Sequence, residues 1–168
     1  FSDPKFLNAV GSAASVDLHI NPALTTLIEG NGVAVAAPTD DFDGQVRASL
    51  SPVDIGADAG NFMGVDLSGP VITYTALTNT LSTTNRVLSV TITDLSGIAS
   101  GANAPRIYFR KGAGSYFSAQ CGGSAPTYSC TIDNALIGGV VISDTVSYFV
   151  IAQDTAGNIS ANPSTGLV

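Results

Sequence analysis

The sequence predicts an all-β protein whose larger, C-terminal part folds as a β-sandwich. One observation is the alternation of Tyr148, Val150 and Ala152, which places these side chains on one face of a strand. A second is that Asp154 and Gly157, residues suited to a tight turn, follow this strand directly. The third is the composition, in which only 11% of residues are charged and Trp is absent. Together these features favour strands and turns over helices.

Seven or eight short strands are expected in the last 100 or so residues. The clearest is 86–93, where Leu88, Val90 and Ile92 alternate with smaller or polar residues. The expected strands are 71–76, 86–93, 106–110, 116–119, 128–132, 139–142 and 145–153, followed by a short last strand at 158–160. So many short strands in a segment of this length fit a sandwich.

The first 66 residues differ from the rest in charge and pattern. They contain two basic and nine acidic residues, whereas residues 67–168 contain four of each, and the whole chain has a net charge of −7. Their apolar clusters are separated by Gly, Asn and Pro at intervals too short for strands with a core of their own. We therefore expect two units, 1–66 and 67–168, of which the first packs against something else.

Four motifs occur in order in the first unit. They are Phe1-Ser-Asp-Pro4-Lys-Phe6, Asp17-Leu-His19-Ile20, Asp41-Phe-Asp43-Gly44-Gln-Val-Arg47 and Pro52-Val-Asp54-Ile55-Gly56-Ala57-Asp58. This order resembles the closing coils of secreted bacterial right-handed parallel β-helix proteins, and the resemblance covers about residues 1–60. It implies a terminal cap, which shields the apolar end of a solenoid. Ala59 departs from the family's glutamate, and the sequence lacks the earlier coils that carry the sites of polysaccharide-cleaving members.

Two motifs in the second unit each place an aspartate after a strand and a glycine in the turn that follows. They are Asp94-Leu-Ser96-Gly97-Ile98 and Asp154-Thr-Ala-Gly157-Asn158. With the strand of Tyr148, they resemble fibronectin type III and bacterial immunoglobulin-like domains over about residues 69–168. The resemblance implies a Greek-key sandwich, used as a scaffold by many surface proteins, in which this tyrosine often serves as a corner residue.

Cys121 and Cys130 enclose eight residues, among them Gly122, Gly123 and Pro126, so a hairpin would bring the two sulfurs together. We expect a disulfide, which implies an oxidising compartment and an extracellular or cell-surface location. Two free thiols are the alternative, and two cysteines alone do not complete a tetrahedral metal site.

Six aspartates are candidate ligands for Ca²⁺, a cation that prefers oxygen ligands. They are Asp41, Asp43, Asp54, Asp58, Asp94 and Asp154. The alternative, which we favour, is that they form turns, because an aspartate readily accepts the backbone N–H two residues further on. Paired carboxylates also serve glycoside hydrolysis, but Trp, the usual sugar-stacking residue, is absent. No cofactor is expected other than the candidate Ca²⁺.

His19 is the only histidine, and Asp17 would share its face of a strand. This pair is a weak hint of a catalytic triad, and we expect a structural role instead. No catalytic residue is assigned, and we expect the protein not to be an enzyme.

Aromatic and basic side chains of the second unit form a candidate recognition face, defined by Arg106, Tyr108, Arg110 and Tyr116. Neighbouring strand residues point to opposite sides of a sheet, so about half of the aromatic residues must lie outside the core. Such a face binds glycan or protein by stacking and cation–π contacts, although amphipathic strand aromatics are common without a ligand.

These features favour a non-catalytic structural or adhesive module of an extracellular bacterial surface protein. Its expected partners are other protein chains or the rest of a larger polypeptide. The alternative is an accessory carbohydrate-binding domain of a secreted polysaccharide-degrading enzyme. Nucleic acid and membrane insertion are not expected, because the chain has neither a basic cluster nor an apolar run of roughly 20 residues.

Overall fold

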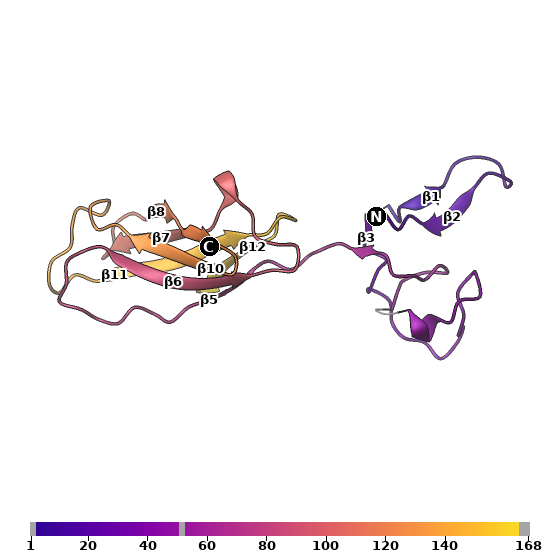
Figure 1. Cartoon of the computed structure of the whole chain (residues 1–168), viewed down its shortest axis with the longest axis horizontal. Coiled ribbons are helices and arrows are strands. Elements are labelled where there is room, and N and C mark those ends of the chain that lie inside the picture. Colours follow the sequence, from indigo (N-terminus) through magenta and orange to yellow (C-terminus); the bar gives the residue numbers. More distant parts are fainter. Residues whose placement is uncertain (1–2, 51–52, 165–168) are drawn as a thin grey trace. The chain divides into compact units, whose positions relative to one another are not determined.

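The computed structural model describes residues 3–50 and 53–164, and it divides the chain into two compact units (Figure 1). Unit 1 is Phe1–Val65 and unit 2 is Asp66–Val168. Within the described ranges the only helical segments are two short 3₁₀ turns, η1 (Arg47–Ser49) and η2 (Gly101–Asn103). The prediction of an all-β protein is confirmed. No helix in the described part of the chain is long and apolar enough to cross a membrane.

Unit 2 contains two antiparallel sheets of four strands each (Figure 1). The first has the order β5-β6-β10-β9, with bounds Val71–Thr73, Arg86–Thr93, Thr127–Ile132 and Gly122–Ser124. The second has the order β12-β11-β7-β8, with bounds Ile159–Asn162, Val146–Gln153, Arg106–Lys111 and Phe117–Gln120. Neighbouring strands are often not consecutive in sequence, so the chain crosses repeatedly from one sheet to the other.

The two sheets of unit 2 share one hydrophobic core. In β6 every second residue is buried, because Leu88, Val90 and Ile92 face inward as the alternation predicts. Ile107 and Phe109 of β7 enter the same core from the other sheet and are fully buried. Burial of such side chains contributes about 1.5–3 kcal/mol each, so this core is the main source of stability in unit 2.

In unit 2 one strand expected from the sequence is absent and one observed strand was missed. No strand occurs at 139–142, because Gly138 and Gly139 adopt positive φ angles of 77° and 74° and turn the chain. A short strand that the pattern did not indicate, β9, pairs instead with β10. Its sequence, Gly-Gly-Ser, has no side-chain alternation to reveal it.

Unit 1 contains two short ladders. Strands β1 (Phe6–Asn8) and β2 (Asp17–Ile20) pair antiparallel, and β3 (Thr25–Thr26) pairs parallel with β4 (Met63–Gly64). The buried residues among those described in this unit are only Ile20, Thr26, Asp54 and Ala59. The ladders do not identify a solenoid coil, so the β-helix cap stays a prediction.

Carboxylates hold together segments of unit 1 that are distant in sequence. Asp54 is only 6% exposed, and its two oxygens accept the N–H groups of Gly30 and Gly60, each at 3.0 Å. Asp58 accepts the N–H of Ile20 at 2.7 Å, and Glu29 accepts that of Phe62 at 2.7 Å. Hydrogen bonds to charged groups contribute about 1.5–3 kcal/mol, so they compensate in part for the small core.

We expect the substitution Asp54→Ala to destabilise unit 1 selectively. It would remove the charged acceptor of the N–H groups of Gly30 and Gly60, and each of these partly buried hydrogen bonds contributes about 1.5–3 kcal/mol. Amide hydrogen exchange measured by NMR should show lost protection in unit 1 and unchanged protection in β6 and β10. The exposed Asp40→Ala variant is the control, and equal exchange in both variants would contradict the assigned role.

Candidate functional site

Three of the four aspartates predicted as ligands in unit 1 lie together. One carboxylate oxygen from each of Asp41, Asp43 and Asp58 falls within 4.8 Å of the others. Asp54 is engaged elsewhere, as described above. Arg47 is not the cation of this group, because its Nη2 donates to the carbonyl oxygens of Gly56 and Ala57 at 2.5 and 2.9 Å. The cation of this group is instead the imidazole of His19.

His19 lies between two carboxylates. Its Nδ1 is 2.5 Å from Oδ1 of Asp17, and its Nε2 is 3.0 Å from Oδ2 of Asp43. These contacts, that with Asp17 foremost, raise the pKa of His19 to about 9. A protonated imidazole that donates from both nitrogens has no lone pair for a metal or for accepting a proton. This geometry favours a structural role for His19 and makes a cation at Asp43 redundant.

In unit 2, Asp94 and Asp154 are brought together with a third carboxylate, that of Asp66. The sequence reasoning missed Asp66, because it lies 28 residues before Asp94 at the boundary between the units. A signal was present: the tetrapeptide Asp-Leu-Ser-Gly occurs at 66–69 and again at 94–97. In both copies the aspartate Oδ1 accepts the N–H of the serine two residues on, at 2.9 Å.

The four residues of the predicted recognition face belong to β7 and the chain just before β8. Alternation in β7 buries Ile107 and Phe109 and turns Arg106, Tyr108 and Arg110 toward the outer side of the sheet. The side chain of Arg106 donates to the hydroxyl of Ser118 on β8, at 3.1 Å from Nη2. Sequence reasoning missed the residue that links the group, which is Phe149 of β11.

Phe149 joins the aromatic residues into one stack. Its ring lies parallel to that of Tyr108, with centroids 5.1 Å apart and an interplanar angle of 2°. Its other neighbour is Tyr116, whose ring meets it edge-on at 5.0 Å. The guanidinium of Arg110 lies 4.6 Å above the Tyr116 ring. Several ring faces are thus covered by protein groups, whereas sugar stacking needs an open face.

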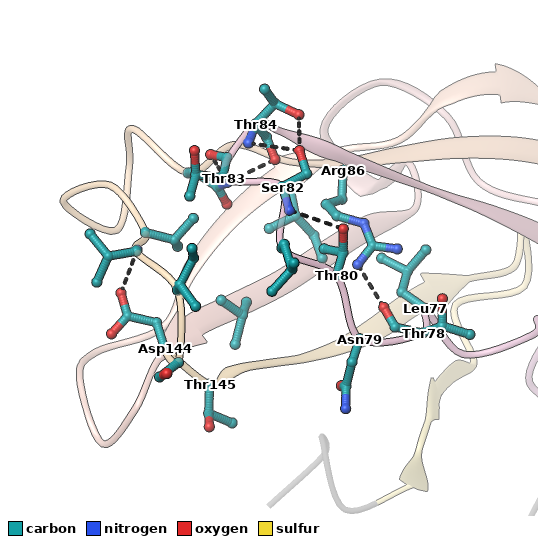
Figure 2. Close-up of a pocket in the computed structure, with 18 of the residues that line it drawn as sticks. Leu77, Thr78, Asn79, Thr80, Ser82, Thr83, Thr84, Arg86, Asp144 and Thr145 are labelled. Carbon is teal, nitrogen blue, oxygen red and sulfur yellow. Dashed lines mark hydrogen bonds between the residues drawn. The ribbon is translucent and has the colours of Figure 1, made fainter.

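A pocket of about 460 Å³ lies in unit 2 between the loops 77–86 and 140–146 (Figure 2). Its rim is rich in hydroxyl groups, but many of its polar groups bond to one another. Arg86 donates from Nη1 to the carbonyl oxygen of Thr78 at 2.8 Å, and the N–H of Val141 donates to Asp144 at 2.9 Å. Sequence reasoning did not indicate this pocket, because its two loops are distant in the chain.

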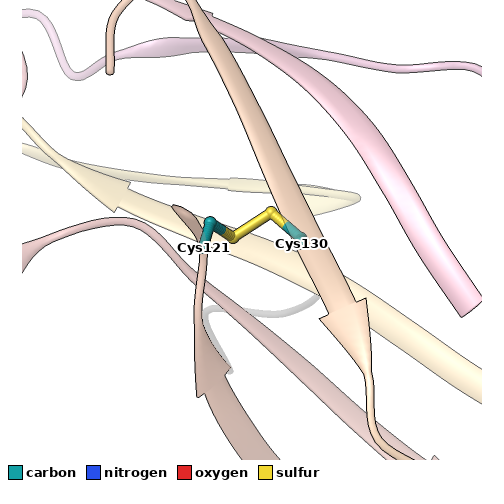
Figure 3. The surroundings of a disulfide bond; sticks show 2 residues. All are labelled: Cys121 and Cys130. Atoms are coloured by element: carbon teal, nitrogen blue, oxygen red, sulfur yellow. A yellow bond between two sulfur atoms is a disulfide. The ribbon is translucent and has the colours of Figure 1, made fainter. Parts of the chain in front are cut away.

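Cys121 and Cys130 form the predicted disulfide (Figure 3). Cys121 is the single residue between β8 of one sheet and β9 of the other, and Cys130 lies in β10. The bond therefore fixes the point at which the chain crosses between the sheets. Both cysteines are buried, at 4% and 0% exposure.

Tyr148 differs from the corner residue that the resemblance implies. Its hydroxyl accepts the N–H of Leu77, 71 residues upstream, at 2.7 Å. A corner tyrosine bonds to backbone only a few residues before itself. Tyr148 therefore anchors the loop that follows β5.

No protein-family model matches this chain, and a search of curated proteins finds no match either.

We expect the disulfide to stabilise unit 2 by about 2–3 kcal/mol, because it closes a short loop in the unfolded chain. The sequence separation of the cysteines is 9. Urea unfolding of the oxidised and the reduced protein, followed by tyrosine fluorescence, measures the difference. The double variant Cys121→Ala and Cys130→Ala should match the reduced protein within about 1 kcal/mol, and equal stability of all three would contradict the expectation.

We expect His19 to titrate near pH 9 in the folded protein. Because this pKa is raised from 6.5, the ion pairs stabilise unit 1 fully below pH 6.5, and that stabilisation is lost as the pH rises through 9. NMR titration of this single imidazole measures the value directly. Asp17→Asn should return the pKa of His19 toward 6.5, whereas Asp40→Asn should leave this pKa unchanged. A wild-type midpoint near 6.5 would refute the placement of His19 between the carboxylates of Asp17 and Asp43.

Proposed function

We propose that the chain is a non-catalytic structural or adhesive module of an extracellular bacterial surface protein. The proposal depends on one observation, which is that the aspartate side chains of unit 2 accept backbone N–H groups in turns. Asp94, Asp133, Asp144 and Asp154 each accept a backbone N–H of their own turn, from Ser96, Ala135, Val141 and Asn158 respectively. Groups engaged in this way shape turns, and they are poorly placed for acid–base chemistry on a substrate.

The class we propose for unit 2 is a Greek-key sandwich of the fibronectin type III or immunoglobulin-like kind. The strand orders β5-β6-β10-β9 and β12-β11-β7-β8 support it, because two antiparallel sheets with chain crossings between them define such sandwiches. The shared core of the two sheets gives further support. A compact sandwich of this kind serves as a spacer or as a platform for loops.

An extracellular location is the part of the proposal that the disulfide supports. Disulfides persist in oxidising compartments and are rare in the cytosol. The bond between Cys121 and Cys130 joins buried side chains, where reductants have little access.

For unit 1 we propose a β-helix cap that another polypeptide covers. Large apolar side chains are exposed here: Val33 is 82% exposed, Phe42 77% and Val35 64%. Val33 and Val35 line a pocket of about 790 Å³ together with Val46 and Ile55, among others. Contiguous apolar surface of this kind marks protein–protein contact.

The carbohydrate-binding alternative depends on the recognition face. Two observations weigh against it, namely the parallel stack of Tyr108 on Phe149 and the cover that Arg110 gives to Tyr116. Tyr116 is nevertheless 42% exposed, so it is the residue through which a sugar would be bound.

Sedimentation velocity on the oxidised chain of 168 residues tests the proposal. If a second copy of the chain can cover this surface, we expect concentration-dependent self-association, which Val33→Ser weakens because it removes exposed apolar surface beside the pocket of unit 1. Leu95→Ser is the matched control, since Leu95 is 98% exposed but belongs to unit 2, and it should leave association unchanged.

A glycan array probed with the same protein separates the two functions. The structural proposal expects no binding above background. Glycan binding that Tyr116→Ala abolishes in a folded variant would establish the carbohydrate-binding alternative. A protein that remains monomeric at all concentrations would remove self-association from the proposal.

A further inference from the structure

Three carboxylates converge at one end of the sandwich in unit 2. Asp66 opens the unit, Asp94 follows β6 directly, and Asp154 follows β11 directly. One oxygen of each lies within 4.8 Å of one oxygen of the other two. Three separate segments of chain therefore deliver negative charge to one point.

A buried oxygen without a partner distinguishes this cluster from ordinary turn-forming aspartates. Oδ2 of Asp66 is buried and accepts no hydrogen bond from any described residue. Its other oxygen, Oδ1, accepts the N–H of Ser68 at 2.9 Å. A buried, unpaired oxygen of a charged group is costly unless a cation completes it.

No basic side chain supplies that cation. Within the described ranges, none of the three aspartates forms an ion pair with lysine, arginine or histidine. Asp154 is only 2% exposed, so solvent does little to screen its charge. Its oxygens accept the backbone N–H of Asn158 at 2.7 Å and the side-chain Nδ2 of Asn158 at 2.8 Å. These neutral donors orient Asp154 without cancelling its charge.

The backbone around the cluster is already in place. The N–H of Thr155 donates to the carbonyl of Gly97 at 3.0 Å, and that of Ala99 donates to Gln153 at 2.9 Å. The side chain of Asn158 also donates to the carbonyl of Asp66, at 2.9 Å. The three segments are therefore held together before any ligand arrives, which reduces the entropic cost of binding.

We propose that Asp66, Asp94 and Asp154 form a Ca²⁺ site. Carboxylate oxygens are hard ligands, and Ca²⁺ accepts them in the irregular arrangements that three loops provide, whereas Mg²⁺ demands a near-ideal octahedron. Water and backbone carbonyls complete the coordination. The site is independent of the function proposed above and would serve in any protein that contains this unit.

NMR titration of the oxidised chain with CaCl₂, after EDTA treatment, tests the site. We expect shifts centred on the amides of Ser68, Ser96 and Asn158, with a Kd of about 10⁻⁴–10⁻³ M, as in extracellular modules. MgCl₂ should bind at least about tenfold more weakly. Asp66→Asn and Asp94→Asn keep the acceptor for the serine N–H but remove a charge, so each should weaken Ca²⁺ binding about tenfold or more.

Asp133→Asn is the matched control. Asp133 also accepts the N–H two residues on, from Ala135 at 3.1 Å, but it lies outside the cluster, so its variant should bind Ca²⁺ as the wild type does. Spectral dispersion verifies that each variant is folded. The proposal is overturned by the absence of shifts up to about 10 mM Ca²⁺, which is well above the expected Kd. It is equally overturned by unchanged affinity in Asp66→Asn and Asp94→Asn, or by shifts centred on Asp41 and Asp58 of unit 1.

Discussion

Aspartate carboxylates that accept backbone N–H groups are the interaction on which the form of both units depends. In unit 1 they take the place of a core: Asp54 joins the segments around Gly30 and Gly60, and few side chains are buried. In unit 2 the core supplies the stability, and the aspartates set where strands end, as Asp94 does after β6. The same chemistry accounts for a chain with many acids but few ion pairs, since most of its carboxylates are occupied by neutral donors.

The fold of unit 2 was predictable wherever one face of a strand is buried. The alternation of β6 follows from its position between a core and solvent, so hydropathy alone located it. The segment 139–142 looked like a strand because it is apolar, but the positive φ of Gly138 and Gly139 decides against it. Strand β9 has no pattern to detect. In unit 1, hydrogen bonds between distant segments determine the structure, and hydropathy does not report them.

The parts of the candidate sites that depend on residues close in sequence were predictable, and those that depend on distant residues were not. The disulfide was predictable because its cysteines flank one hairpin, and the outward side of Tyr108 follows from period two. Phe149 could not be placed, since its stack on Tyr108 depends on the pairing register of β11 with β7. Asp66 was missed because 88 residues separate it from Asp154, although the repeated Asp-Leu-Ser-Gly motif pointed to it.

The placement of the first and last strands of unit 2 affects how the unit would respond to tension. Strands β5 and β12 both run away from the turn that contains Asp154, and hydrogen bonds join them: Tyr74 donates to the carbonyl of Asn162, whose side chain donates to Ile72. A force that pulls these strands in opposite directions along their length loads such bonds in shear. These bonds must then break together and not one after another. The contact between β5 and β12 therefore resists stretching.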